Sequence, residues 1–250
     1  MVISLKIKFE NLTGVLLLLW NICLVNVCCN QNIQWHTDLH RSSKNNGFHR
    51  EVTSKVEVST EGGPSTFGTC VLLLIETIPM GAYVDIYQLK MGEEYGGPKV
   101  ISEYIDIEKP DYESTKHDIY IYGNMTRHRG VISGEVTYPL HLRYHRLRKN
   151  VEFAEVTLKH PRVLINCSNL KQKLGGNLHQ FPCYPHQSTT CTWKELGYTV
   201  ESPALTFLVP VGNSNHIFLV TTVTIATTLM GCAYILYLVM KSPELKGKTN

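Results

Sequence analysis

The chain carries a short, nearly continuous apolar run at Cys70-Val-Leu-Leu-Leu-Ile75. Turn-forming residues flank the run, with Gly62-Gly-Pro64 before it and Pro79-Met-Gly81 after it. An apolar run of this length between turn signals is typical of a strand that is buried on both faces. We therefore expect residues 70–75 to form a central strand of a sheet.

Other segments with strand-like patterns lie on both sides of this run. They are residues 51–58, 100–107, 118–122, 134–144, 151–158 and 205–211. These segments are rich in β-branched and aromatic residues, and turns such as Gly96-Gly-Pro98 and Gly175-Gly-Asn177 separate them. No stretch has a convincing amphipathic helical pattern, apart from a turn or two near residues 88–91. The sequence predicts an all-β fold, a β-sandwich of about eight or nine strands over residues 30–216.

Two longer apolar stretches lie near the ends of the chain. Residues 14–27 follow Lys6 and Lys8, and Val27 and Cys29 suit a signal-peptidase site, so residues 1–29 are expected to be a signal peptide. The alternative is an uncleaved signal anchor. Residues 217–240 carry no formal charge, and as a helix they would reach about 36 Å, enough to cross a hydrocarbon core about 30 Å thick. We expect one transmembrane helix at residues 217–240.

The charges around this second segment predict its orientation. Lys241, Lys246 and Lys248 follow it, whereas residues 212–216 contain no Lys or Arg. The positive-inside rule then makes residues 241–250 a cytosolic tail and leaves the β-domain lumenal or extracellular. The Lys-x-Lys-x-x spacing of Lys246 and Lys248 resembles a dilysine signal for retrieval to the endoplasmic reticulum. The alternative is that both lysines only satisfy the positive-inside preference.

Four cysteines are expected in the mature β-domain. In an oxidising compartment an even number indicates two disulfides, with three possible pairings. Cys183 and Cys191 enclose seven residues, so we expect a local bridge between them and a second bridge between Cys70 and Cys167. The alternative is a zinc site that includes His179 and His186 with Cys183 and Cys191, although the two-residue Cys spacing of zinc knots is absent.

Two N-glycosylation sequons lie in the same domain. They are Asn124-Met-Thr126 and Asn166-Cys-Ser168. Asn124 follows a glycine in an expected turn and is the better candidate. Asn166 precedes a cysteine that we expect to be bridged. The net charge of +3 is too small to indicate a nucleic-acid partner.

No convincing catalytic or cofactor-binding motif is found in the sequence. Asp106 and Glu108 have metal-ligand spacing, but in a strand they only share one face, so they are interpreted as a solvated edge. In a strand, the imidazoles of His141 and His145 would lie about 13 Å apart and could not bind one ion. Alternation places Leu140, Leu142 and Tyr144 on the core face. It places His141, Arg143 and His145 on the opposite face. This polar face is interpreted as solvated surface or as a partner contact.

The apolar segment has one face of small residues, formed by Thr221, Thr224, Thr228 and Gly231. Small side chains let helices approach closely in lipid, and threonine hydroxyls can bond across helices. This small-residue seam is therefore a candidate contact with a membrane-embedded partner, although a span that merely tolerates threonine would have the same pattern.

Several strings together resemble one family. They include Phe48-His-Arg-Glu51, Ile78-Pro-Met-Gly-Ala-Tyr-Val-Asp-Ile-Tyr-Gln-Leu89, Asp106-Ile-Glu-Lys-Pro-Asp-Tyr112, His141-Leu-Arg-Tyr-His145 and Val209-Pro-Val-Gly212. With these strings and its expected topology, the chain resembles the PIG-X family of glycosylphosphatidylinositol (GPI) biosynthesis over roughly residues 48–240. The resemblance departs at Leu147, where a proline is expected nearby, and at residues 41–47.

The resemblance implies a non-catalytic subunit of the endoplasmic reticulum membrane. Such a subunit stabilises the multispanning mannosyltransferase that adds the first mannose to the GPI precursor, and it needs no cofactor, metal or small-molecule substrate of its own. One expected span also could not enclose a lipid-linked donor site. Two other classes were weighed. A Golgi-dynamics-domain cargo receptor would carry a coiled-coil stalk and tail aromatics, and an immunoglobulin-type adhesion domain would show a Cys-Trp-Cys pattern; the chain shows neither.

Overall fold

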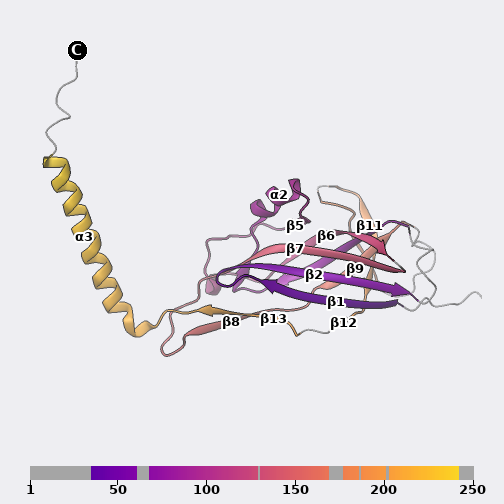
Figure 1. Ribbon diagram of the computed structural model, residues 1–250, viewed down its shortest axis with the longest axis horizontal. Coiled ribbons are helices and arrows are strands. Elements are labelled where there is room, and N and C mark those ends of the chain that lie inside the picture. The colour runs from indigo at the N-terminus through magenta and orange to yellow at the C-terminus, as the bar shows by residue number, and fades with distance from the viewer. Residues whose placement is uncertain are drawn as a thin grey trace, which may run out of the picture.

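The computed structural model describes residues 35–60, 68–128, 130–168, 177–185, 187–200 and 203–241. The described residues form an elongated β-domain and one long helix that leaves it at one end (Figure 1). The expected signal peptide at residues 1–29, His186 and the tail lysines Lys246 and Lys248 lie outside the described residues.

Strands dominate the domain, which confirms the predicted all-β class. In chain order they are β1 (Trp35–Lys44), β2 (His49–Thr60), β3 (Cys70–Ile78), β4 (Ala82–Tyr83), β5 (Lys99–Ser102), β6 (His117–His128), β7 (Val131–Leu142), β8 (Phe153–Leu158), β9 (Arg162–Cys167), β10 (Leu178–Pro182), β11 (Thr190–Leu196), β12 (Thr199–Val200) and β13 (Leu205–Pro210). The described part of the chain thus has more strands than the eight or nine expected, because β1, β4 and β9–β12 were not recognised.

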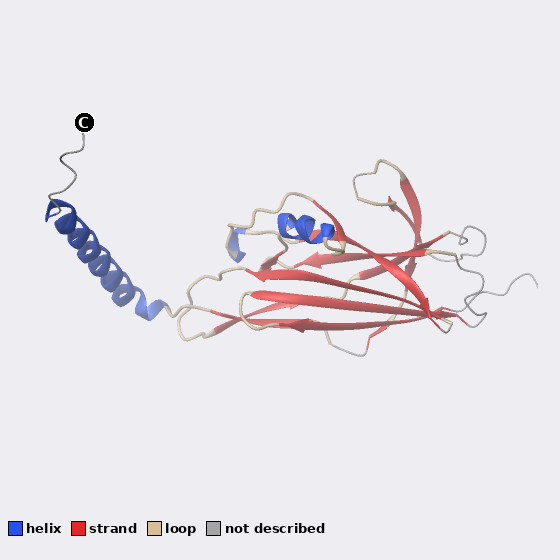
Figure 2. Cartoon of the chain, turned by 45° about the horizontal axis from the view of Figure 1, so that its top comes forward, coloured by secondary structure: helices blue, strands red, loops and turns tan. Residues whose placement is uncertain are grey.

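Strand β6 gives the domain two layers, because it pairs with different strands along its length. Its first part pairs with β3, from Ile78 opposite His117 to Val71 opposite Asn124. Residues 125–128 pair instead with β7. The strand order is β10-β11-β9-β3-β6-β7-β2-β1-β12, with β4 beside β7 and β5 beside β6, while β8 and β13 form a separate pair. The two parts of the large sheet are visible as facing layers in Figure 2.

The main core lies between these layers. It joins apolar side chains of β2 and β7 to those of β3 and β9, and side chains of β8 and β13 pack against it. At the crossing point, a Cβ on Gly123 of β6 would lie 2.6 Å from the Val136 Cγ2 of β7. Because this distance is shorter than a van der Waals contact, the close approach of the layers requires glycine there.

Strand β3 occupies the central position that residues 70–75 were expected to take. It lies between β6 and β9. Leu72 and Leu74 point into the main core, whereas Leu73 and Ile75 belong to a second buried cluster on the opposite face, where they pack with Trp193. This prediction is confirmed, and burial on both faces explains why the strand lacks polar alternation.

Among the described residues, two α-helices accompany the strands. The short helix α2 (Ile86–Glu94) begins at Asp85, whose carboxylate accepts hydrogen bonds from the backbone N–H groups of Tyr87 and Gln88. It covers the one or two helical turns expected near residues 88–91. Helix α3 (Ile217–Lys241) follows a 3₁₀ turn, η4 (Ser214–His216). Residues 214–241 are apolar enough to cross a bilayer, and none of the side chains of α3 is buried.

Candidate functional site

The candidate site lies at the end of the β-domain from which α3 leaves. Strands β8 and β13 lie side by side there, and β13 leads directly towards α3 (Figure 1). The segment between β7 and β8, residues 143–152, is called the basal loop below. Its Arg148 donates a backbone hydrogen bond to Gly212 at 3.1 Å and accepts one from Ser214 at 3.2 Å. The basal loop is therefore fixed to the start of the apolar helix.

The prediction that His141, Arg143 and His145 share one polar face of a strand is wrong in part. Strand β7 ends at Leu142, so side-chain alternation does not continue beyond it. Arg143 is 4% exposed and lies inside the domain, whereas Tyr144, which was expected to face the core, is 74% exposed. The three polar residues therefore do not form one exposed patch.

Arg143 is held by the domain itself. Its guanidinium donates hydrogen bonds to the backbone oxygens of Ala82 and Lys109 and lies over the ring of Tyr83, 4.8 Å from its centre. These contacts tie the beginning of the basal loop to β4 and to the segment before the 3₁₀ turn η2 (Asp111–Glu113). A partner would have to displace them to reach the charge, so Arg143 acts as a positioning residue.

The two histidines also contact the domain. His145 Nδ1 lies 2.9 Å from an Asp111 carboxylate oxygen, and the His145 side chain is only 7% exposed. His141 Nε2 lies 2.9 Å from Gln88 Oε1 of α2, and its ring contacts those of His49 and Tyr83. Burial, and then the neighbouring His49, lower the pKa of His141. The neutral imidazole is therefore favoured at neutral pH, which suits packing better than recognition of an anion.

The side chains that do reach solvent come later in the basal loop. Arg146, Arg148 and Lys149 are exposed. Leu147 is also exposed, although its side chain lies against Gly212, where an added Cβ would be 2.4 Å away. Sequence reasoning missed this group, although the string Arg146-Leu-Arg-Lys149 directly follows the motif that was singled out.

The cysteines form two disulfides, Cys70–Cys167 and Cys183–Cys191. These are the two pairs that we expected. Because the sulfurs of Cys183 and Cys191 are bonded to each other, they are not available as the thiolate ligands of the alternative zinc site. Among the residues that the structure describes, no group of three or more His, Cys, Asp or Glu side chains could hold a metal ion.

The expected strand at residues 100–107 is shorter than predicted, which changes the setting of Asp106 and Glu108. Strand β5 ends at Ser102, and both carboxylates lie in the following loop rather than on a strand edge. Asp106 accepts a hydrogen bond from the backbone N–H of Glu108 at 3.1 Å. Its carboxylate therefore stabilises a local turn.

The two sequon asparagines lie on the two strands that flank β3, and they differ in exposure. Both are paired with Val71 of β3, Asn124 from β6 and Asn166 from β9. Asn124 is exposed. Asn166 is half-buried, and its Nδ2, the atom that a glycan would modify, donates a hydrogen bond to the Thr192 backbone oxygen at 3.1 Å. Asn124 is thus the more accessible acceptor.

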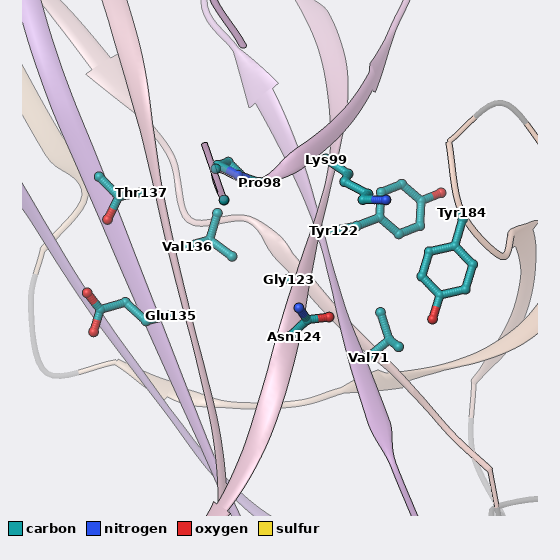
Figure 3. Close-up of a pocket in the computed structure, with 12 residues that line it drawn as sticks. Val71, Pro98, Lys99, Tyr122, Gly123, Asn124, Glu135, Val136, Thr137 and Tyr184 are labelled. Carbon is teal, nitrogen blue, oxygen red and sulfur yellow. The ribbon is translucent and has the colours of Figure 1, made fainter. Parts of the chain in front are cut away.

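Asn124 also lines an open cavity of about 590 Å³. Figure 3 shows Lys99 and Tyr184 to one side of Asn124, and Glu135 and Thr137 to the other. The cavity is open to solvent and holds one acid and one base that come from different strands. No nucleophile with an adjacent general base is present among the residues that line it, so its walls provide polar contacts rather than a catalytic constellation.

The small-residue seam lies along α3, and all four of its residues are exposed. The hydroxyls of Thr224 and Thr228 donate hydrogen bonds at 2.8 Å to the backbone oxygens of Val220 and Thr224. Because these donors are satisfied within the helix, the seam offers a close-packing surface rather than hydrogen bonds that await a partner. An added Cβ on Gly231 would meet nothing within 4 Å.

Comparison with known proteins identifies the family. Residues 45–240 match the family model described as PIG-X / PBN1. The chain belongs to the PIG-X / PBN1 family. The match begins just after β1 and ends within α3, so it covers the β-domain from β2 onwards, the basal loop and nearly all of the apolar helix.

Three mammalian members of the family are similar to the chain over most of its length. Each is named "GPI alpha-1,4-mannosyltransferase I, stabilizing subunit" and is 30% identical over 200 residues. The Homo sapiens protein is covered over 76% of its length, and the Rattus norvegicus and Mus musculus proteins over 78%; in each case the match spans 78% of this chain.

Proposed function

We propose that this chain is the non-catalytic, stabilising subunit of a GPI mannosyltransferase I. The observation that carries the proposal is the similarity to three relatives with this name, which extends over 78% of the chain. The described residues support an accessory role in two ways. Their one membrane-competent helix could not enclose a lipid-linked donor, and the residues that line the cavity beside Asn124 include no nucleophile with an adjacent general base.

The proposed topology is a type I protein of the endoplasmic reticulum membrane. Residues 1–29 would be removed as a signal peptide, residues 30–216 would lie in the lumen, residues 217–240 would cross the membrane and residues 241–250 would form the cytosolic tail. The catalytic partner is proposed to span the membrane several times and to hold the mannose donor. Glycosylation in the lumen is proposed at Asn124, and less readily at Asn166 because of its hydrogen bond to Thr192.

The partner is proposed to pack against the small-residue seam of α3, with the β-domain held beside its lumenal loops. A seam of this kind lets two helix backbones approach closely, and close approach in lipid provides the packing energy that holds membrane helices together. Without this contact the catalytic subunit would lose that packing energy and would be degraded or aggregate. This mechanism needs no chemistry from the present chain.

The first prediction tests this function in cells that lack the chain. Loss of the chain is expected to lower the amount of the catalytic subunit and the surface display of GPI-anchored proteins, and the wild-type chain should restore both. Replacing Thr224, Thr228 and Gly231 together with leucine should weaken recovery of the catalytic subunit, because bulky side chains would hold the helices apart. Recovery is measured by affinity purification, and activity by transfer of the first mannose in microsomes.

A matched control places three leucines on the opposite face of α3, at Thr222, Ala226 and Ala233, and should leave recovery unchanged. The stabiliser proposal would be wrong if purified chain transferred mannose by itself. It would also be wrong if the knockout cells had no transfer activity while their catalytic subunit was present at its normal level.

The second prediction concerns retention. If Lys246 and Lys248 form a retrieval signal, changing both to serine should move a fraction of the chain to the Golgi or the cell surface. Acquisition of glycans resistant to endoglycosidase H would report this movement. An unchanged distribution would show that another feature, such as the partner itself, retains the chain.

A further inference from the structure

The basal loop has an unusual composition for a loop beside a membrane-competent helix. Residues 143–152 contain the basic residues Arg143, Arg146, Arg148 and Lys149 and only one acidic residue, Glu152. Arg143 is buried, but the other three basic side chains are exposed. Exposed apolar side chains are interleaved with them: Tyr144, Leu147 and Val151 are 74%, 53% and 37% exposed. Basic heads and apolar or aromatic bodies together suit the interfacial region of a bilayer.

The backbone hydrogen bonds of the basal loop hold it close to the beginning of α3. Arg148 pairs through its backbone with the segment 212–214, and Val211 donates a backbone hydrogen bond to Glu152 at 2.8 Å. Helix α3 begins only four residues after Asn213. Four residues span at most about 14 Å even when fully extended. The long side chains of the loop thus lie close to the point where the chain would enter the headgroup region.

Two side chains of the loop contact the turn η2, and one of them, Arg146, remains exposed there. His145 pairs with Asp111, and the guanidinium of Arg146 lies over the ring of Tyr112, 4.1 Å from its centre. The acids next to the exposed basic residues are Asp111 and Glu113 of η2, Glu152 at the end of the loop and Glu155 of β8, and Asp111 already faces His145. Residues 146–149 themselves contain three basic residues and no acid. The exposed end of the loop therefore presents a net positive charge.

We propose that the basal loop binds the phosphate-bearing headgroups of anionic phospholipids in the leaflet next to the β-domain. Arg146, Arg148 and Lys149 contact the headgroups, while Tyr144, Leu147 and Val151 lie at interfacial depth. The contact fixes the tilt of the β-domain on the membrane and thus the face that it turns towards a neighbour. This inference rests on the part of the proposed function that places α3 across a bilayer, and it does not depend on the mannosyltransferase partner.

The third prediction tests this contact with the full-length chain in lipid nanodiscs. A fluorescent amino acid incorporated at Val151, an exposed apolar position, reports quenching by spin-labelled headgroups. Quenching should be stronger in phosphatidylcholine with phosphatidylserine than in phosphatidylcholine alone, and added salt should reduce the difference. Each neutralised basic side chain should lower the preference for anionic lipid by roughly fivefold. The Arg146→Gln/Arg148→Gln/Lys149→Gln variant should therefore respond equally to both membranes.

Two controls accompany this measurement. The Lys55→Gln/Lys99→Gln/Lys159→Gln variant loses the same charge from exposed positions outside the basal loop and should keep the wild-type response. The same fluorophore at His128, at the far end of β6, should not be quenched in either membrane. A further membrane replaces phosphatidylserine with phosphatidylinositol at equal charge. Equal quenching in the two anionic membranes would indicate attraction to charge, and unequal quenching would indicate recognition of one headgroup. Both results support the loop as a lipid contact.

Quenching that is equal in neutral and anionic membranes for the wild-type chain would overturn the proposal. Loss of quenching at Val151 when the catalytic subunit is co-reconstituted would also overturn it and would make the basal loop a protein interface. Recovery of the catalytic subunit, measured in the same preparations, separates this failure from failure of the proposed function. Normal recovery without lipid-dependent quenching would leave the stabiliser role standing and remove only the lipid contact.

Discussion

Replacing Arg41 with methionine is expected to lower the free energy of unfolding of the β-domain by about 3–5 kcal/mol. The Arg41 and Glu76 side chains are both fully buried, and Arg41 Nη2 donates to Glu76 Oε1 at 2.7 Å. The same guanidinium donates to Ser54 Oγ at 3.2 Å and to the Lys159 backbone oxygen at 2.7 Å. One side chain thus joins β1 to β2, β3 and the segment after β8, and its loss leaves a carboxylate buried without its partner.

The measurement is urea unfolding of the chain in detergent, followed by tryptophan fluorescence, since Trp193 is buried. The double variant Arg41→Met/Glu76→Leu should recover most of the loss, because it removes both charges. Arg162→Met is the matched surface control: Arg162 also forms a two-pronged pair with a glutamate, Glu195, but in a partly exposed setting. It should cost at most about 1 kcal/mol. Equal losses for both arginines would contradict the prediction.

The same pair should make stability depend on pH. Burial raises the pKa of Glu76 to about 7, although the neighbouring Arg41 opposes the shift. The folded state therefore binds more protons than the unfolded state between pH 4.5 and about 7, where stability should fall as the pH rises. The Glu76 contribution amounts to roughly 3 kcal/mol over this window. Glu76→Gln should flatten the slope there, and an unchanged slope would show that another group causes it.

The central strand could be predicted from the sequence because its signal is local. A strand that is buried on both faces must be apolar along its length, and residues 70–75 satisfy this requirement without reference to the rest of the chain. Strand β1 gave no such signal. Its inward-facing residues are Thr37, Leu39 and Arg41, so two of the three buried positions are polar and the alternation of apolar residues is lost. Arg41 is tolerated because β2, β3 and the segment after β8 supply acceptors for its guanidinium.

The candidate site was predicted less well, because its geometry depends on contacts between distant residues. The motif at residues 141–145 was found, but the end of β7 at Leu142 reverses the expected positions of Arg143 and Tyr144. The importance of the next four residues follows only from the hydrogen bonds of Arg148 to the segment before α3. The pattern of apolar and polar residues within a single strand cannot reveal that Arg148 pairs with a segment more than sixty residues later.

Removing the Cys70–Cys167 disulfide should be as damaging as breaking the buried ion pair. This bridge joins β3 to β9 across a sequence separation of 97, at positions directly opposite each other in the sheet. In the chain-entropy account a loop of this length stabilises the folded state by about 4.7 kcal/mol, because it restricts the unfolded chain. Both cysteines are buried in the main core, so Cys70→Ala/Cys167→Ala would also leave some packing unfilled.

The second bridge provides the matched comparison. Cys183 and Cys191 are separated by only 8 positions, and the same account gives a contribution of about 2.5 kcal/mol. In urea unfolding, Cys183→Ala/Cys191→Ala should therefore lose roughly half as much stability as Cys70→Ala/Cys167→Ala. In cells the Cys70 variant should also be the less abundant of the two, because degradation acts on the unfolded population. Equal losses for the two variants would mean that local strain or packing, rather than loop length, governs how these disulfides stabilise the β-domain.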